Sequence, residues 1–398
     1  MTPAGAAASP APARTRVAPW RDERIRAIAI QVLTVALILG FAAYLAGNAA
    51  ENLRRQGIAT GFAFLGREAS FAVSPTLIPF SPADTYARAL LVGLLNTLLV
   101  ASLGIVFATM LGFVVGIARL SSNWLVSRLT LAYVEVMRNT PLILQIFLWW
   151  DVLRVGAPQP RDAWHFLPHV FISNRGVVFP VPFYDPVYLW MLAALAAGAG
   201  AAYLLRLWAR QRLARTGERP QTAWPGLTLV TLPPILVFIA GGAPLRLDLP
   251  QVTRFDFSGG QSITPEFAAL LFALVAYSGA FIGEIVRSGI QSVSRGQSEA
   301  AQALGLSRGQ TLRLVVLPQA IRVIVPPTTS EYLSLTKNSS LAVAIGFPEL
   351  FSVSNTIANQ TGQAIEVMVI VASTYLVISL AISLAMNLYN RWTALVER

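Results

Sequence analysis

Long apolar runs recur along this chain and limit the folds that it can adopt. A helix needs about 20 predominantly apolar residues to cross the hydrocarbon core of a bilayer. Runs of that length predict about eight membrane-spanning helices, at 27–46, 90–118, 129–150, 188–207, 226–244, 265–287, 319–346 and 364–388. Only 12% of the residues are charged, whereas soluble domains have roughly 25%. The sequence therefore predicts an all-α polytopic membrane protein, because so few charges cannot cover a surface that faces water.

The arginines predict the orientation of the chain in the membrane. If the N-terminus is cytoplasmic, the cytoplasmic segments hold about twice as many arginines as the outer segments, as the positive-inside rule requires. We therefore expect both termini to be cytoplasmic. The net charge of +11 is spread between the apolar runs, so membrane topology explains it and we expect no nucleic-acid partner.

The first apolar run predicts an anchor. Residues 1–26 are rich in Pro and Ala over most of their length, which predicts a disordered cytoplasmic N-terminus. The run at 27–46 is longer than the apolar core of a signal peptide, which spans about 7–15 residues. We therefore expect an uncleaved extra transmembrane helix here, followed by a periplasmic loop at 47–89.

Sites that depend on cysteine or on a metal are not expected. The chain has no cysteine, which excludes disulfides, thiol catalysis and cysteine-based metal centres. His165 and His169 have the spacing of metal ligands on a helix, but Pro168 between them would break that helix. We expect neither a metal site nor catalytic residues.

The sequence also lacks a phosphate-binding loop. Such a loop needs glycines followed by Lys and Ser or Thr, and the single lysine, Lys337, has no such pattern around it. Residues 257–261 read FSGGQ and look like the signature of ATP-binding cassette (ABC) ATPases. They fall on the outer side between two predicted spans, where a turn containing two glycines explains them. The chain is therefore not expected to hydrolyse ATP.

A helix–turn–helix is predicted on the inner membrane face within residues 284–320. Glu299, Ala300 and Ala301 favour a helix. Gly305 stands where that helix could end and the chain reverse, and Ser307 can cap a second helix. From these features alone, the segment is either an amphipathic connector between spans or a surface on which another protein packs closely.

The spacing in this segment favours the second interpretation. Glu299-Ala300-Ala301, Gly305, Val315 and Leu317-Pro318 follow one another at the intervals of the cytoplasmic EAA loop, and the segment resembles that loop in bacterial ABC-importer permeases. The resemblance implies that this loop docks into a groove of the ATP-binding subunit. The expected coupling residues are Glu299, Ala300, Ala301, Gly305, Leu317 and Pro318.

Further stretches resemble one branch of this family. Residues 134–145, 282–291 and 334–350 are similar to segments of the polar amino-acid permeases, which include those for histidine, glutamine and glutamate. Residues 52–65 look like the general L-amino-acid permeases, whose larger layout this chain shares. The resemblance implies a type I importer core in two parts, at 90–150 and at 265–390, with the EAA loop at 288–318. Residues 151–264 are an insertion with periplasmic loops and two more spans.

The resemblance also implies the partners and the location. We expect ABC ATPase subunits, a second permease subunit that is identical or a paralogue, a periplasmic amino-acid-binding protein and the lipid bilayer. The chain would bind no cofactor itself, because ATP is used by the partner subunits. It would lie in the bacterial inner membrane, where it would form the translocation path for L-amino acids of polar, acidic or broad range.

Polar residues inside predicted spans are candidates for that path, because they are costly in a membrane and usually functional. An amino-acid zwitterion needs donors for its carboxylate and acceptors for its ammonium group. Arg138 suits the carboxylate, and Glu135 or Glu331 suits the ammonium group. Structural pairing of Arg138 with Glu135, or of Lys337 with Glu331, is the alternative. The candidate path residues are Glu135, Arg138, Asn139, Thr140, Glu331, Lys337, Asn338, Ser339 and Ser340.

Other functions remain as alternatives. A permease of the same family could carry another small polar solute. A secondary transporter could use Glu135 and Glu331 as a proton relay, but the motif at 299–318 would then have no explanation. A membrane enzyme would need a catalytic set, and a mechanosensor or scaffold would not need polar residues in its spans.

Overall fold

The computed structural model describes residues 23–55, 57, 60–218, 220–254 and 256–393. Most of the predicted N-terminal segment 1–26 lies outside these residues. Among them, six helices are long and apolar enough to cross a membrane: α1 (Glu23–Arg55), α2 (Tyr86–Ala118), α5 (Pro186–Thr216), α6 (Ala223–Ala240), α7 (Pro265–Gln291) and α12 (Ala364–Thr393). A bent pair made by residues 308–345 and 350–361 raises this number to seven. The all-α membrane fold is thus confirmed, with differences in two of the predicted spans.

The predicted span at 129–150 is wrong as a single helix. It is divided into α3 (Trp124–Asn139) and α4 (Leu142–Arg154), with Thr140 extended between them. Pro141 causes the break, because proline lacks an N–H and forces the residue before it out of the helical conformation. The side chain of Gln145 then donates to the carbonyl oxygens of Met137 (2.9 Å) and Thr140 (3.0 Å), which satisfies the exposed end of α3.

The predicted span at 319–346 is also less regular than expected. The helix α10 (Leu317–Asn338) passes into a 3₁₀ turn, η5 (Ser339–Ile345), and the chain then bends by 52° into α11 (Leu350–Thr361). Gly346 has a φ of 77°, which glycine adopts without steric cost. Two prolines, Pro326 and Pro327, lie inside α10 and do not end it.

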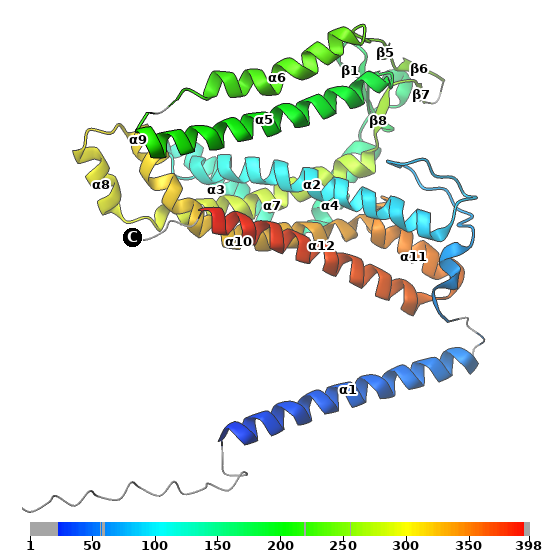
Figure 1. Ribbon diagram of the computed structural model, residues 1–398. Coiled ribbons are helices and arrows are strands. Elements are labelled where there is room, and N and C mark those ends of the chain that lie inside the picture. The colour runs from blue at the N-terminus through cyan, green and yellow to red at the C-terminus, as the bar shows by residue number, and fades with distance from the viewer. Residues whose placement is uncertain (1–22, 56, 58–59, 219, 255, 394–398) are drawn as a thin grey trace, which may run out of the picture.

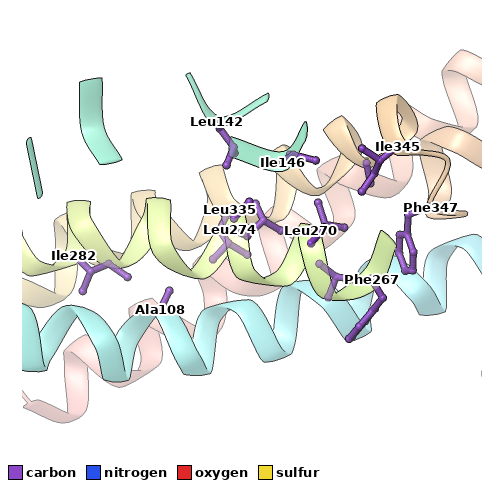
Figure 2. Packing of buried hydrophobic residues seen from close by; sticks show 14 of the residues in the cluster. Ala108, Leu142, Ile146, Phe267, Leu270, Leu274, Ile282, Leu335, Ile345 and Phe347 are labelled. Atoms are coloured by element: carbon purple, nitrogen blue, oxygen red, sulfur yellow. The ribbon is translucent and has the colours of Figure 1, made fainter. Parts of the chain in front are cut away.

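The helix α7 lies at the centre of the bundle. It contacts α2, α3, α4 and α10. The helix α11 packs against α2, and α12 packs against α10. Figure 2 shows Leu270 and Leu274 of α7 pointing toward Leu335, with Leu142 and Ile146 of α4 nearby. Lipid is as apolar as these side chains, so close van der Waals packing rather than escape from water holds such helices together.

The helices α5 and α6 form a separate hairpin along one side of this bundle (Figure 1). They pack mainly against each other, and Gly198 of α5 lets them approach closely: an added Cβ there would lie 2.1 Å from the carbonyl oxygen of Leu229. The helix α1 lies apart from the bundle in Figure 1, and none of its most apolar stretch is buried within the protein. These three helices therefore depend on lipid or on a partner to cover their apolar surface.

Short strands, which the sequence did not predict, lie at the end of the bundle opposite the helix α8 (Arg295–Ala303) (Figure 1). Four of them form an antiparallel sheet in the order β1-β2-β3-β8, and two strand pairs flank it. The strands are β1 (Trp164–Leu167), β2 (Val170–Ser173), β3 (Gly176–Phe179), β4 (Val181–Pro182), β5 (Leu247–Asp248), β6 (Gln251–Val252), β7 (Phe257–Ser258) and β8 (Gln261–Ile263). The remaining short elements there are the 3₁₀ turns η2 (Phe62–Gly66) and η3 (Pro160–Asp162).

The FSGGQ stretch forms the turn between β7 and β8. Gly259 and Gly260 both have positive φ, 76° and 68°. Glycine adopts this conformation readily in tight turns. An added Cβ on Gly259 would lie 2.6 Å from a carboxylate oxygen of Asp248. The turn interpretation of these two glycines is confirmed.

Candidate functional site

The segment predicted to be a helix–turn–helix follows α7 directly. The helix α8 ends at Ala303, and the turn after it contains Gly305, which has a φ of 80° and donates its backbone N–H to the carbonyl of Gln302 (2.9 Å). Ser307 then caps α9 (Arg308–Thr311) in a capping box with Gln310. The helix, the glycine turn and the second helix are thus confirmed, because each rests on a local preference of the chain.

The helix α8 has one buried side and one exposed side. Ala301 is buried, and this side of the helix lies against a π-helical turn, η4 (Leu312–Val316). Glu299 and Ala300 are exposed, and Leu304 is 83% exposed. A single exposed apolar side chain is common on protein surfaces, so exposure shows only that this side of the helix is accessible to a partner.

The loop is also tied to the membrane-spanning part of the chain. The side chain of Gln319, near the start of α10, donates to the side-chain oxygen of Gln297 in α8 (3.1 Å). Leu317 and Pro318 form the first turn of α10, and the π-helical turn joins them to α9. A force on α8 would therefore be transmitted both to α7, which precedes it, and to α10, which follows it.

The predicted polar residues of the third span gather at the end of α3. Arg138 lies 5.0 Å from the ring centroid of Phe281 in α7, in a cation–π contact. This contact joins the end of α3 to α7.

The structural pairings that the sequence left open are not formed. Glu135 instead accepts a hydrogen bond from the side chain of Asn139 one turn away (3.2 Å). Among the ion pairs of the described residues, none involves Arg138 or Lys337. Arg138, Glu135 and Asn139 are exposed in the single chain. This leaves their polar groups available to a ligand or a second subunit.

The candidate path residues in and after α10 differ in exposure and in hydrogen bonding. Glu331 is half-buried, whereas Lys337 is exposed. The hydroxyls of Ser339 and Ser340 donate to the carbonyls of Thr336 (2.7 Å) and Lys337 (2.8 Å), so they satisfy the end of α10. Ser339 is fully buried. Thr140 and Asn338 lie at the ends of α3 and α10, both half-buried.

Residues 225–395 match the protein family described as "Binding-protein-dependent transport system inner membrane component". The chain is also 48% identical, over 95% of its length, to the general L-amino acid transport system permease protein AapQ of Rhizobium johnstonii, and covers 94% of that protein. The chain belongs to this family of ABC-importer permeases. Its members are multi-pass membrane subunits that typically have no catalytic activity of their own.

Two other relatives match nearly the whole permease. The putative amino-acid ABC transporter permease protein YhdX of Escherichia coli is 47% identical, with 95% of this chain and 97% of that protein covered. The glutamate/glutamine/aspartate/asparagine transport system permease protein BztB of Rhodobacter capsulatus is 44% identical, with 95% and 96% covered. The family resemblance inferred from residues 134–145, 282–291, 299–318 and 334–350 is confirmed.

A close crossing of α2 and α7 in this permease was not predicted from the sequence. Gly112 and Gly116 of α2 face Gly279 and Gly283 of α7. A Cβ added to Gly116 would lie 2.7 Å from both the carbonyl oxygen of Gly283 and the Cβ of Val286. Glycines spaced four residues apart in apolar helices permit such close approach. The spacing is visible in both apolar runs and could have predicted the crossing.

An ion-pair cluster lies at the end of this crossing, where α7 approaches α8. Glu284 of α7 pairs with Arg119, at the end of α2, and with Arg287 one turn along α7. The Nε of Arg287 donates to both carboxylate oxygens of Glu284, at 3.0 and 3.1 Å. All three side chains are at most 25% exposed, so the cluster joins α2 to α7 near the loop.

A buried carboxylate was also missed. Glu349 is fully buried and caps α11 by accepting hydrogen bonds from the backbone N–H groups of Phe351 (2.8 Å) and Ser352 (2.6 Å). The hydroxyl of Tyr375 in α12 donates to the same carboxylate (3.0 Å). An acidic residue followed by an apolar run is the signal for such a cap.

No group of three or more His, Cys, Asp or Glu side chains within the described ranges is placed to hold a metal ion. His165 lies in β1, and His169, with a φ of 61°, lies in the turn after it.

Proposed function

We propose that this permease forms part of the translocation path of an importer for L-amino acids of polar, acidic or broad range. The observation that carries the proposal is its identity of 44–48% over 95% of the chain to three proteins named as amino-acid permeases. The polar residues at the end of α3 and in α10 support it, because Arg138 can bind a carboxylate and Glu331 an ammonium group. In the proposed complex, this face of α3 and α10 meets a second permease subunit, identical or paralogous, across the path.

We further propose that the loop at 288–318 docks on ABC ATPase subunits in the cytoplasm. The exposed side of α8, with Glu299, Ala300 and Leu304, supports this assignment. ATP binding in the partner subunits would move α8, and with it α7 and α10, because both helices continue from the loop. In this arrangement the ATPase subunits hydrolyse ATP and this chain binds no cofactor.

The proposed orientation places both termini in the cytoplasm and the strands on the outer side of a bacterial inner membrane. The strands and α8 lie at opposite ends of the bundle, as this orientation requires (Figure 1). The two-part core at 90–150 and 265–390, and the inserted segment at 151–264, are part of the same proposal. A periplasmic amino-acid-binding protein would deliver the substrate at the outer end.

Uptake of labelled glutamate tests the proposal. It would be measured in cells that lack this chain and in cells with the chain restored, with unlabelled amino acids as competitors. We expect restored uptake that many L-amino acids compete for. Competition by glutamate and aspartate alone would narrow the range to acidic substrates. If uptake is not restored although the protein is in the membrane, the solute is not an amino acid of this class, and another small polar solute becomes the leading candidate.

A further inference from the structure

Four arginines that are far apart in the sequence line one pocket at the strand end of the bundle. Arg154 ends α4, Arg161 lies in η3, Arg175 follows β2 and Arg254 follows β6. The pocket has a volume of about 310 Å³. Under the proposed orientation this is the outer side, where membrane proteins have fewer arginines than inside. The rule that explains the cytoplasmic arginines therefore does not explain this cluster.

Two of the arginines hold the cluster together. The side chain of Arg154 donates to the carbonyl of Asn174 (3.2 Å), in the turn before Arg175, and Arg161 donates to the carbonyl of Arg254 (3.0 Å). These bonds connect four separate segments around the pocket. Arg154 is half-buried, whereas Arg161, Arg175 and Arg254 are exposed. The structure thus fixes the position of the cluster while its charges still face outward.

The charge around the pocket remains positive. Arg154 and Arg175 also line an adjoining cavity of about 440 Å³, together with Asp256 and Glu266. Within the described part of the chain, no ion pair or side-chain hydrogen bond holds Arg175. Guanidinium groups recognise carboxylates well because of their planar fork of donors. The pocket therefore suits an acidic partner.

We propose that this arginine-lined pocket, contributed by the inserted segment, is a docking site for an acidic surface of the amino-acid-binding protein that serves this importer. This docking site rests on the proposed function and specifies where the amino-acid-binding protein contacts the permease. A free amino acid is a poorer fit, because isolated charge pairs in water stabilise little. A protein surface covers the pocket, excludes water and presents several carboxylates at once. Trp164, 59% exposed on the edge strand β1 and three residues after Arg161 in the chain, is an aromatic side chain of the kind common at such interfaces.

The test uses the complete transporter, with its ATPase subunits, in a lipid bilayer. The binding protein loaded with glutamate or glutamine is titrated, and its concentration for half-maximal stimulation of ATP hydrolysis is measured at low and high salt. Arg175→Glu should raise this concentration about tenfold at low salt, because charges at an interface control association. The difference should shrink at high salt, and excess binding protein should overcome it.

Two further variants separate docking from folding. Arg175→Lys keeps the positive charge but loses the planar fork of donors, so its half-saturating concentration should lie between those of the wild type and Arg175→Glu. Arg246→Glu is the matched control, because Arg246 is an exposed arginine at the same end of the bundle that does not line this pocket. Its half-saturating concentration should equal that of the wild type.

Equal concentrations for Arg175→Glu and Arg246→Glu would overturn the docking site. An unchanged concentration for Arg175→Glu combined with slower import of glutamate, but not of glutamine, would also overturn it and would assign the pocket to a free carboxylate. If the binding protein fails to stimulate even the wild-type transporter, it is the proposed function that fails.

Discussion

The substitution Gly116→Ala tests whether the crossing of α2 and α7 depends on glycine. The added methyl group would lie 2.7 Å from the carbonyl oxygen of Gly283 and from the Cβ of Val286, and also from a Val286 Cγ. An ordinary contact is at least 3.4 Å, so the helices must move apart by roughly 0.7 Å, the difference between the two distances. Neither contact can relax by rotation of a flexible side chain, because one is backbone and the other is the root of a β-branched residue.

Such overpacking costs about 1–3 kcal/mol. The assay is thermal unfolding of the purified transporter in detergent, followed by the loss of soluble, monodisperse protein. We expect the midpoint for Gly116→Ala to fall by several degrees, because a loss of this size shifts the midpoint by about 2–4 °C per kcal/mol in a domain of roughly 200 residues.

Gly200→Ala is the matched control. Gly200 lies inside the apolar helix α5, and a Cβ there would meet nothing within 4 Å. Alanine is the better helix former by roughly 1 kcal/mol, so this variant should be as stable as the wild type or more so. If the two variants unfold at the same temperature, the glycine crossing does not limit the packing of α2 and α7 and the reasoning is refuted.

Three more predictions concern the loop and the path. Gly305→Pro should abolish ATP-driven uptake while the protein still inserts in the membrane, because proline allows neither the φ of 80° nor the N–H bond to Gln302. Normal uptake by this variant would contradict the coupling role. Gly309→Ala is the control, because a Cβ at Gly309 would meet nothing within 4 Å. Leu304→Glu should reduce copurification of the ATPase subunits about tenfold, because it places a charge on the exposed side of α8; unchanged copurification would mean that this side does not dock. Arg138→Ala should lower transport of acidic amino acids more than it lowers assembly, measured as uptake per assembled complex, and equal losses would favour a structural role.

Local signals in the sequence predicted the features that depend on neighbouring residues. Apolar runs predicted the membrane helices, because a helix in lipid must be long and apolar whatever surrounds it. Gly305 and Ser307 predicted the loop geometry, because a left-handed turn and a helix cap each involve only a few residues. The spacing of Glu299 to Pro318 identified the family for the same reason, since the motif lies in one continuous segment.

Continuity of a span was harder to predict, because it depends on what surrounds a proline. Pro141 ends a helix, and Gln145 satisfies the carbonyls left at that end. Pro326 and Pro327 remain inside α10, which packs against both α7 and α12. All three are prolines in predicted spans, so the residue type alone does not distinguish the two outcomes.

The class of protein, its long apolar helices and the presence of the loop could thus be inferred from the amino-acid sequence alone. The tertiary structure was needed to show which distant residues meet: Arg119 with Glu284, Arg138 with Phe281, and four arginines around one pocket at the strand end of the bundle. These contacts join residues that are far apart in the chain, and a single sequence contains no signal that shows which of them will meet. The glycine spacing in the two apolar runs permits a close crossing, but that α2 crosses α7, and so brings Arg119 to Glu284, depends on how the whole bundle packs.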